Sequence, residues 1–255
     1  MTLYFVGLGL SDEKDITIKG LEAVKKCEKI YLEVYTSQLN CSLQELEAFY
    51  GKKIMTATRA TVETLAEETI LRDAQKDDTA LLVVGDPLAA TTHIDLMLRA
   101  RKMGIRTKVI HNASIMNAIA ATGLQLYKFG KTTSLPFPEK SFEPETAYDI
   151  IKKNKIIGAH TLVLLDLRPT EGRFMTANDV IRQLLKIEMK RNEGIFTEQT
   201  LMLGCARIGA KDEKIAFGTA NAIMKEEFGK PVHCLVVPGS LHFVEEEILK
   251  NFIVA

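Results

Sequence analysis

The sequence predicts an α/β protein of two lobes, and three observations carry this prediction. Short apolar runs alternate with helical patterns from the first residues, as in "TLYFVG", "TIKGLEAVKKCEK" and "KIYLEV". This βαβ rhythm indicates a largely parallel sheet covered by helices. The chain has 255 residues, of which 46% are hydrophobic, which is enough for one large domain or two small ones with packed cores. A change of amino-acid composition near the middle of the chain favours two lobes.

The elements follow this pattern in order. Further strands are predicted in "ALLVVG" and "RTKVIH", and a helix in "HIDLMLRARKM". After "HNASIMNAIAATG", the segment "QLYKFGKTTSLPFPEKSFEPE" concentrates Pro, Thr and Ser, and strands then resume in "HTLVLLD", "QTLMLGCA" and "HCLVVPG". We therefore expect an N-terminal α/β lobe over residues 1–112 and a C-terminal α/β lobe over residues 113–255, with a small-residue helix from Ser114 at the hinge.

Composition excludes several classes of function. Lys and Arg total 33, as do Asp and Glu, so no global field favours nucleic acid or an anionic membrane. We find neither a signal-peptide pattern nor an apolar run near the ~18 residues of a membrane span. The scattered cysteines lack metal-ligand spacing and fit a reducing compartment; they are Cys27, Cys41, Cys205 and Cys234. We expect a cytoplasmic protein without a metal, nucleic-acid or membrane partner.

The first motif is "VGLGLSDEKDIT", where Gly7 and Gly9 end the first strand. A dinucleotide fingerprint requires a glycine or another small residue where Asp12 stands, so that interpretation fails. A loop in which missing side chains let a ligand approach the backbone remains possible. A plain strand-end turn explains the same residues about as well.

The second motif, "GDPLAATTH", follows the strand in "ALLVV". Gly85 relieves steric demand, Pro87 fixes its own φ, and Asp86 presents a carboxylate at the strand end, where open α/β sheets bind ligands. A carboxylate there suits a cationic or hydroxyl-rich ligand. The alternative is an Asx-type turn in which Asp86 only binds local backbone amides.

The third motif is "VIHNASIMNAIAATG", in which Asn112 or Ser114 is predicted to cap the following helix. The helix N-terminus suits an anionic group, although ordinary capping explains the residues equally well. The three motifs together describe backbone amides, one acid and small apolar walls, without a phosphate loop or clustered metal ligands. Such a site suits an amphoteric molecule of about the size of adenosine.

The chain resembles the diphthine synthase family of the tetrapyrrole methylase superfamily, whose members use S-adenosylmethionine. The motifs that carry the resemblance span nearly the whole chain: "LYFVGLGLSDEKDITIKGLEAVKKCEKIYLEVYTS", "GDPLAATTH", "IHNASIMNAIAATGLQLYKFGKTTSLPF", "HTLVLLDLRP", "RFMTAND" and "VVPGSLHFVEEE". In the first of them, "GLGLSDEKDIT" replaces the G-x-G-P-G-D loop that is typical of the porphyrin enzymes. This replacement separates the chain from those enzymes.

The resemblance implies a two-lobed tetrapyrrole-methylase-like fold, with a largely parallel sheet in the first lobe, a mixed sheet in the second and the cofactor in the cleft between them. It implies a homodimer that uses S-adenosyl-L-methionine, leaving S-adenosyl-L-homocysteine, to methylate the amine of a modified histidine on translation elongation factor 2 in diphthamide biosynthesis. Carried onto matching positions, the family's cofactor contacts fall on Leu10, Asp86, Ala89, Ser114, Ile115, Leu165, Ile208 and His233. Most of these residues are expected to act through backbone groups, and Ala89 departs from the larger aliphatic residue of relatives.

No catalytic base is predicted, because alignment and exclusion of water can supply much of the acceleration of an in-line methyl transfer. The acceptor amine must be unprotonated, and His111, His233 and Asp166 are candidates to influence its protonation. A lone histidine beside a strand is, however, more often a satisfied core residue.

The segments "LPFPEKSFEP" and "DLRPTEGRF" are expected to form a rim that receives the protein substrate, with Arg168 or Arg173 meeting its acidic groups. A solvated loop is the simpler interpretation of such charges. Two other functions stay open: a tetrapyrrole (precorrin or uroporphyrinogen-type) methyltransferase on the same scaffold, and a non-catalytic module that binds adenosyl ligands.

Overall fold

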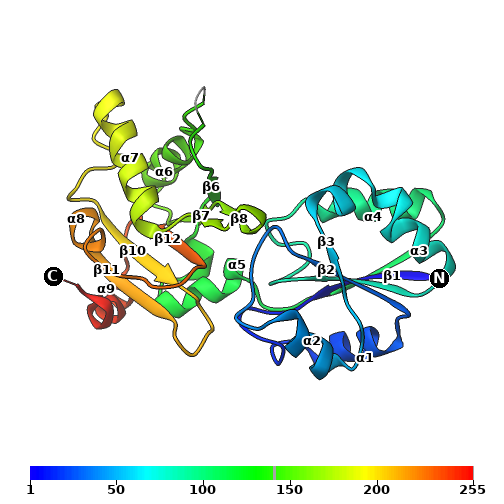
Figure 1. Ribbon diagram of the computed structural model, residues 1–255. Coiled ribbons are helices and arrows are strands. Elements are labelled where there is room, and N and C mark those ends of the chain that lie inside the picture. Colours follow the sequence, from blue (N-terminus) through cyan, green and yellow to red (C-terminus); the bar gives the residue numbers. More distant parts are fainter. Residues whose placement is uncertain (140–141, 255) are drawn as a thin grey trace. The chain divides into compact units, whose positions relative to one another are not determined.

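The computed structural model describes residues 1–139 and 142–254 of the chain. The chain folds into two compact units, Met1–Ala118 and Ile119–Ala255. Figure 1 follows the chain through both units, and the boundary lies after the short helix α5 (Ile115–Ala118). The boundary expected from the sequence, between residues 112 and 113, precedes this helix.

The first unit contains a five-stranded sheet in the order β3-β2-β4-β1-β5, in which every neighbouring pair is parallel. The parallel sheet predicted from the βαβ rhythm is thereby confirmed. Its strands are β1 (Thr2–Gly7), β2 (Lys29–Glu33), β3 (Met55–Ala57), β4 (Thr79–Val83) and β5 (Arg106–Ile110). Its other helices are α1 (Ile18–Lys26), α2 (Leu43–Tyr50), α3 (Ile70–Lys76) and α4 (His93–Lys102).

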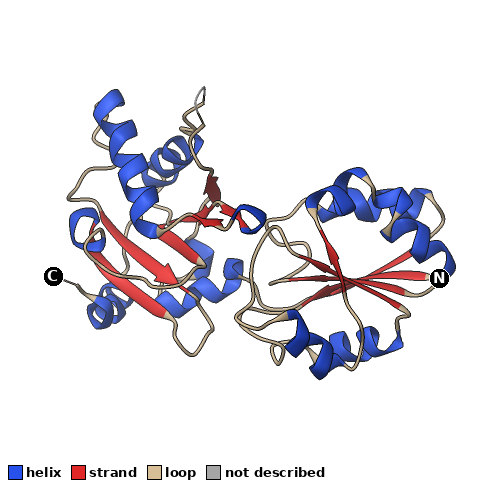
Figure 2. Ribbon diagram, viewed as in Figure 1, coloured by secondary structure: helices blue, strands red, loops and turns tan. Residues whose placement is uncertain are grey.

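Helices cover both faces of this sheet (Figure 2). Successive side chains of β1 point to opposite faces, so Leu3 and Phe5 belong to one apolar core and Tyr4 and Val6 to the other. The first core includes residues of α3 and α4, and the second includes residues of α1 and α2. Because both faces are buried, the strands read as nearly continuous apolar runs in the sequence.

The second unit contains a mixed five-stranded sheet in the order β11-β10-β12-β7-β6. Only β6 and β7 pair in parallel, whereas the other three neighbouring pairs are antiparallel, as the resemblance implied. Its strands are β6 (Thr133–Leu135), β7 (Thr161–Leu165), β10 (Leu201–Ala206), β11 (Lys214–Thr219) and β12 (His233–Val237). The short strands β8 (Leu167–Arg168) and β9 (Arg173–Phe174) form a separate antiparallel pair.

The helices of the second unit are α6 (Thr146–Ile156), α7 (Ala177–Arg191), α8 (Ala220–Ile223) and α9 (Phe243–Leu249). Helix α7 begins with a capping box, in which Thr176 and Asp179 satisfy each other's backbone amides. Its apolar face buries Val180, Ile181 and Leu184 in the core together with residues of α6 and the sheet. This packing fixes the position of the polar face of α7.

Two buried glutamates tie loops of the second unit to its helices. Glu188 of α7 accepts hydrogen bonds from the Tyr148 hydroxyl at 2.7 Å and from the backbone amides of residues 194–196 at 2.6 to 2.8 Å. Glu245 of α9 accepts from His160 Nε2 at 3.0 Å, from two backbone amides and from Lys128. Burial alone raises the pKa of each carboxyl, but these donors outweigh it and lower both pKa values to about 2.

Among the helices of the described residues, none is both long and apolar enough to cross a membrane.

Candidate functional site

The three sequence motifs meet at one edge of the first sheet. Strand β1 lies between β4 and β5, and all three run in the same direction, so their carboxyl ends share an edge. The loops that leave this edge begin after Gly7, Val83 and Ile110. In open parallel sheets this edge is where ligands bind. The sequence identified each loop separately, and the strand order brings them together.

Glycines allow the backbones of these loops to touch. A Cβ atom on Gly7 would lie 2.6 Å from the Gly85 carbonyl oxygen and 2.8 Å from Asn112 Cβ, which is closer than real Cβ contacts. Gly9 and Gly85 also exchange two backbone hydrogen bonds, of 3.3 and 2.7 Å, and both have a positive φ. The first two loops are therefore joined backbone to backbone, with no side chain between them.

Asn112 joins the third loop to the first. Its side-chain nitrogen donates to the carbonyl oxygens of Gly7 at 3.0 Å and Asp15 at 2.9 Å. The Asp15 carboxylate in turn accepts from the amides of Leu10 and Ser11, at 3.1 and 2.7 Å. From the sequence, Asn112 is recognisable only as a possible helix cap and Asp15 not at all, because neither contact follows from local spacing.

Asp86 lies at the centre of this edge, and both of its carboxylate oxygens are bonded. Oδ1 accepts from the Leu88 amide at 3.0 Å, which is the Asx-type turn considered above. Oδ2 accepts from His111 Nδ1 at 2.7 Å and from the Asn112 amide at 3.2 Å. Burial alone would raise the pKa of Asp86, but these hydrogen bonds hold it below its ordinary value. Asp86 therefore carries a negative charge at neutral pH.

His111 is held by Asp86 but is otherwise open to solvent, since its side chain is 69% exposed. In the neutral ring, the bond to the carboxylate keeps the proton on Nδ1 and the lone pair on Nε2. Such a carboxylate–histidine pair has an oriented nitrogen that can accept a proton from a ligand. The sequence alone marks His111 only as one of three side chains that could influence the protonation of the acceptor amine.

A buried histidine contacts the loop that carries Asp86. His93, the first residue of α4, is fully buried, and its Nδ1 lies 2.9 Å from the Pro87 carbonyl oxygen. Its Nε2 has no hydrogen-bond partner and lies 3.8 Å from the buried Glu33 carboxylate. This contact fixes Pro87, and with it the turn that carries Asp86. His93 ends the motif "GDPLAATTH", but nothing in its spacing indicates that its ring is buried against Pro87.

Five of the eight predicted cofactor residues lie along this edge: Leu10, Asp86, Ala89, Ser114 and Ile115. Several of their backbone amides are already used. The Leu10 amide donates to Asp15, the Ala89 amide to the Asp86 carbonyl oxygen at 3.2 Å, and the Ser114 amide to Asn117 at 2.8 Å. A ligand contact through the main chain at Leu10 or Ala89 would use the carbonyl oxygen, whereas the Ser114 carbonyl oxygen already accepts from the Asn117 and Ala118 amides at 3.1 and 2.8 Å.

The helix predicted from Ser114 is shorter than expected. Helix α5 has four residues and is followed by a 3-10 turn over Ile119–Thr122, so the expected regular helix was wrong beyond Ala118. Ser114 does cap it, since its hydroxyl accepts from the Met116 amide at 3.3 Å. One helical turn has only a small dipole, which weakens the argument for an anion at this terminus.

The other three predicted cofactor residues lie together at one edge of the second sheet. Leu165 ends β7, Ile208 follows the end of β10, and His233 begins β12. Because β12 is antiparallel to both neighbours, these three positions share an edge. All three residues are buried.

The His233 side chain is a satisfied core histidine. Its Nε2 donates to the Lys230 carbonyl oxygen at 2.9 Å, and its Nδ1 accepts from the Ala177 amide at 3.4 Å. Burial lowers the pKa of His233, so the ring is neutral. A cofactor contact at this position would therefore be made by its backbone, as the resemblance implied for most of the set.

The two rim arginines are directly opposite each other in the β8–β9 pair, and both stack on Phe137. Arg173 lies 4.3 Å from the ring centroid, is half exposed and pairs with Glu171 at 3.4 Å. Arg168 is more enclosed and pairs with Asp166, Glu139 and Glu171 at 3.3 to 3.9 Å. Residues 140 and 141 of the predicted rim lie outside the described residues.

Among the described residues, no group of three His, Cys, Asp or Glu side chains is placed to hold a metal ion.

Comparison with known proteins finds relatives that match nearly the whole chain. Residues 2–223 match the family model of the tetrapyrrole (corrin/porphyrin) methylases. The chain is 46% identical over 269 residues to the diphthine methyl ester synthase of Dictyostelium discoideum, covering 99% of this chain and 98% of that protein. It is 47% identical over 270 residues to the diphthine methyl ester synthase of Homo sapiens, covering 98% and 94%. A crystal structure of diphthine synthase, 37% identical, aligns with a TM-score of 0.91 over 99% of this chain and 96% of that one.

Proposed function

The chain belongs to the tetrapyrrole methylase family and to its diphthine synthase branch, and we propose that it methylates the modified histidine of translation elongation factor 2. It is a methyltransferase, and we propose S-adenosyl-L-methionine as its donor and S-adenosyl-L-homocysteine as the product. The observation that carries the proposal is the full-length likeness to diphthine methyl ester synthases, at 46% and 47% identity. The same membership leads us to propose a homodimer that acts in the cytoplasm.

The strand-end site of the first unit fits such a donor. When bound, S-adenosylmethionine supplies an electrophilic methyl group on a sulfonium, which an acceptor lone pair displaces in line. The ionised Asp86 complements the positive charge of the sulfonium and ammonium groups. Gly7 and Gly85 let the loops of this edge pack closely against one another, which holds in place the turn that carries Asp86. We propose that Leu10, Asp86, Ala89, Ser114 and Ile115 contribute to its binding, together with Leu165, Ile208 and His233.

An acceptor amine needs a free lone pair, and we propose that His111 provides the base. Its Nε2 accepts the proton that the amine gives up, while Asp86 holds Nδ1–H and stabilises the imidazolium that forms. One pair would thus serve two steps, since the same carboxylate complements the donor and orients the base.

The name of the relatives states that their product is a methyl ester. An ester methyl group lies on a carboxylate oxygen, whereas the amine reaction forms a bond from carbon to nitrogen. A carboxylate is nucleophilic without losing a proton at neutral pH, so this step would not need His111. The two acceptors can therefore be separated by their dependence on the base.

The deciding experiment incubates the purified chain with methyl-labelled S-adenosylmethionine and elongation factor 2 that carries the unmethylated histidine modification. Label on the factor is the expected result. Alkali releases label from a methyl ester but not from a methylated amine. Treating the labelled factor with alkali therefore measures the amounts of the two products separately.

Two outcomes would overturn the proposal. Label on a porphyrinogen or corrin precursor, with none on the factor, would make the chain a tetrapyrrole methyltransferase. Binding of S-adenosylmethionine without transfer to either acceptor would make it an adenosyl-ligand-binding module. Factor that already carries the complete modification is the control for labelling at other side chains.

A further inference from the structure

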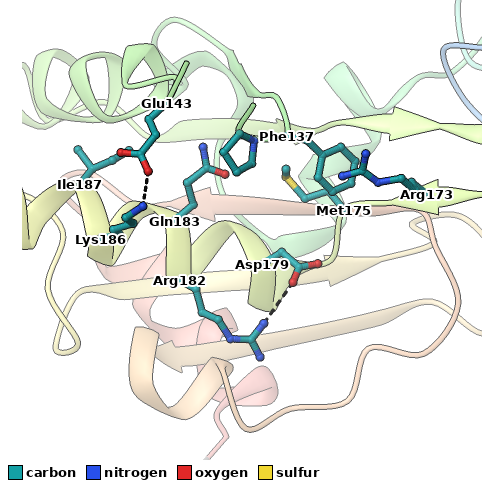
Figure 3. A pocket seen from close by; sticks show the side chains of 10 residues that line it. Phe137, Glu143, Arg173, Met175, Asp179, Arg182, Gln183, Lys186 and Ile187 are labelled. Carbon is teal, nitrogen blue, oxygen red and sulfur yellow. Dashed lines mark hydrogen bonds and ion pairs between the residues drawn. The ribbon is translucent and has the colours of Figure 1, made fainter. Parts of the chain in front are cut away.

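The second unit has a cavity of about 440 Å³ whose charged side chains already have partners (Figure 3). Each cation that lines it pairs with an acid: Arg182 with Asp179, Lys186 with Glu143 and Arg173 with Glu171. A charged ligand would have to displace these partners. A polar atom that lacks a partner lies instead in the first unit, next to the turn that carries Asp86: it is Nε2 of the buried His93.

The turn between β4 and α4 is strained at Ala90. This residue has a φ of +54°, in the left-handed region that residues with a Cβ atom rarely adopt. An asparagine can offset the cost of this conformation through a local hydrogen bond of its side chain, but alanine has no polar atom that could do so. Other residues must therefore hold the turn in place.

One carbonyl oxygen closes this turn. The Pro87 oxygen accepts from Thr91 Oγ1 at 3.0 Å and lies 2.9 Å from His93 Nδ1, which must donate because a carbonyl oxygen can only accept. Both bonds span Ala90 in the sequence. In the neutral His93 ring the proton is therefore on Nδ1, and the lone pair is on Nε2.

The surroundings of Nε2 indicate why this position carries an imidazole. Nε2 is buried, and the nearest carboxylate oxygen, of Glu33, lies 3.8 Å away, which is too far for a hydrogen bond. The Glu33 carboxylate is bonded to the backbone amides of Tyr35 and Thr36, at 2.6 and 2.7 Å. A buried nitrogen without a partner lowers stability, so a phenyl ring would serve burial better. What the imidazole adds is the Nδ1–H group.

The peptide group between Pro87 and Leu88 connects this bond to Asp86. The Pro87 carbonyl and the Leu88 amide belong to one planar unit, so fixing the oxygen also fixes the direction of the N–H group. The Leu88 amide donates to Asp86 Oδ1 at 3.0 Å, and Asp86 Oδ2 accepts from His111 Nδ1 at 2.7 Å. A continuous chain of hydrogen bonds thus runs from the buried His93, through one peptide group and one carboxylate, to the exposed His111.

We propose that His93 is a positioning residue for methyl transfer, which acts through the Pro87–Leu88 peptide group and Asp86 to orient His111. Without the Nδ1–H bond the strained turn relaxes, the peptide group rotates, and the carboxylate loses its direction toward both the methyl donor and His111. The inference rests on the proposed function, in which Asp86 complements the donor and His111 accepts a proton.

Two substitutions separate this role from a merely structural one. His93→Phe keeps a buried ring but removes the N–H group. His93→Asn keeps an N–H group at the same number of bonds from the backbone but leaves a cavity. We expect His93→Phe to lower kcat for amine methylation about tenfold and donor affinity about fivefold, and His93→Asn to recover most of both. The melting temperature should follow the opposite order, with His93→Asn the lower. If activity follows the melting temperature instead, His93 is only structural and the proposal is wrong.

A double substitution tests whether His93 acts through Asp86. Asp86→Ala removes the group that His93 orients, so Asp86→Ala/His93→Phe should bind S-adenosylmethionine as weakly as Asp86→Ala alone. Calorimetry on the parent, the two single variants and the double variant completes the cycle. Losses of affinity that simply add would show that His93 affects the site by another route, and they would overturn the proposal.

Tyr31→Phe is the matched control. Tyr31 belongs to the same unit and is also buried, and its hydroxyl donates to Asp73 at 2.7 Å. Loss of this bond should lower the melting temperature but leave donor affinity and kcat at the parent values. If Tyr31→Phe impairs methylation as much as His93→Phe does, any loss of stability in this unit affects the site, and the positioning role is wrong.

The nuclear magnetic resonance spectrum of His111 reports its orientation without catalysis. Long-range proton–nitrogen correlations of neutral rings show which nitrogen carries the proton, and we expect Nδ1–H for both His93 and His111 in the parent. In His93→Phe the His111 signals should shift toward a mixture of the two tautomers, whereas in Tyr31→Phe they should not.

The spectra and the assays let the two proposals fail in different ways. If the parent methylates elongation factor 2, and His93→Phe matches it in kcat, donor affinity and His111 spectrum, the positioning role is wrong and the function stands. If the parent neither binds the donor nor labels the factor, the proposed function fails, and the spectra alone decide whether His93 orients His111.

Discussion

Asp86 and His111 lie 25 residues apart in the sequence and are joined by a 2.7 Å hydrogen bond at the carboxyl edge of the first sheet. The bond connects the loop after β4 to the loop after β5, which are separated in the sheet by β1. It gives the carboxylate two tasks, since Asp86 closes its own turn and orients an exposed imidazole.

Asp86→Ala should weaken binding of S-adenosylmethionine by about 1.5–3 kcal/mol, because the variant loses a charge and leaves the Leu88 and Asn112 amides without their acceptor. Asp86→Asn should not restore the affinity. Both carboxylate oxygens accept hydrogen bonds, and the amide would turn an N–H group toward one of these donors. Calorimetry with the donor and with S-adenosylhomocysteine measures both effects. Parent-like affinity in Asp86→Ala would confine this residue to the turn.

His111→Gln should lower kcat for amine methylation at least tenfold and leave the affinity for the donor nearly unchanged, because the side chain acts on the acceptor. The loss should be greater for alkali-stable than for alkali-labile label, since a carboxylate acceptor needs no base. Single-turnover labelling of the factor checks this. Equal losses in both kinds of label would mean that His111 positions the substrate and does not take a proton.

Gly7→Ala should destabilise the first unit by about 2–3 kcal/mol, because the new methyl group would overlap the Gly85 carbonyl and force the β1 and β4 loops apart. Donor affinity should fall with it. Gly51→Ala is the control: Gly51 has a φ of +67° but open space around it, so its cost should be about 1 kcal/mol, with no effect on binding. Thermal unfolding and calorimetry on both variants separate packing at the site from backbone strain elsewhere.

Arg173→Glu and Arg168→Glu should differ, although both residues face the predicted rim. Arg173 has one half-exposed partner, so its reversal should slow methylation of the factor about threefold to tenfold at low salt while donor affinity stays unchanged. Arg168 joins three carboxylates, so its reversal should also lower the melting temperature. Rates measured over a salt series test the first expectation. If Arg173→Glu matches the parent at low salt, the basic rim is not used.

Stability should fall in acid through Glu188 and Glu245. Each has a folded-state pKa of about 2 against an ordinary value of 4.5, so the unfolded chain binds more protons between these two values. Their stabilisation is complete above about pH 5 and is lost as the pH falls toward 2. Glu188→Gln and Glu245→Gln should each flatten the dependence of the melting temperature on pH. Unchanged acid sensitivity in both buried variants would refute this assignment.

The sequence by itself determined the parts of this protein that depend on local pattern. Short apolar runs located β1, β4 and β5, and apolar residues at helical spacing located α1 and α4, because the burial of each element must follow its own geometry. The glycines at strand ends, and Asp86 between Gly85 and Pro87, indicated the loops of the site, since tight turns require particular residue types. The pattern overestimated the helix after Ser114, where a run of small residues is compatible with a helix but does not stabilise it beyond one turn.

The tertiary structure alone decided which of these residues meet. The strand order β3-β2-β4-β1-β5 places β1 between two strands that are distant from it in sequence, and this brings Asn112 to Gly7 and His111 to Asp86. Strand pairing depends on burial and hydrogen bonding between residues that are far apart in the chain, and such pairs do not recur at a fixed spacing in the sequence. For the same reason, the grouping of Leu165, Ile208 and His233 follows only from how the strands of the second sheet pair.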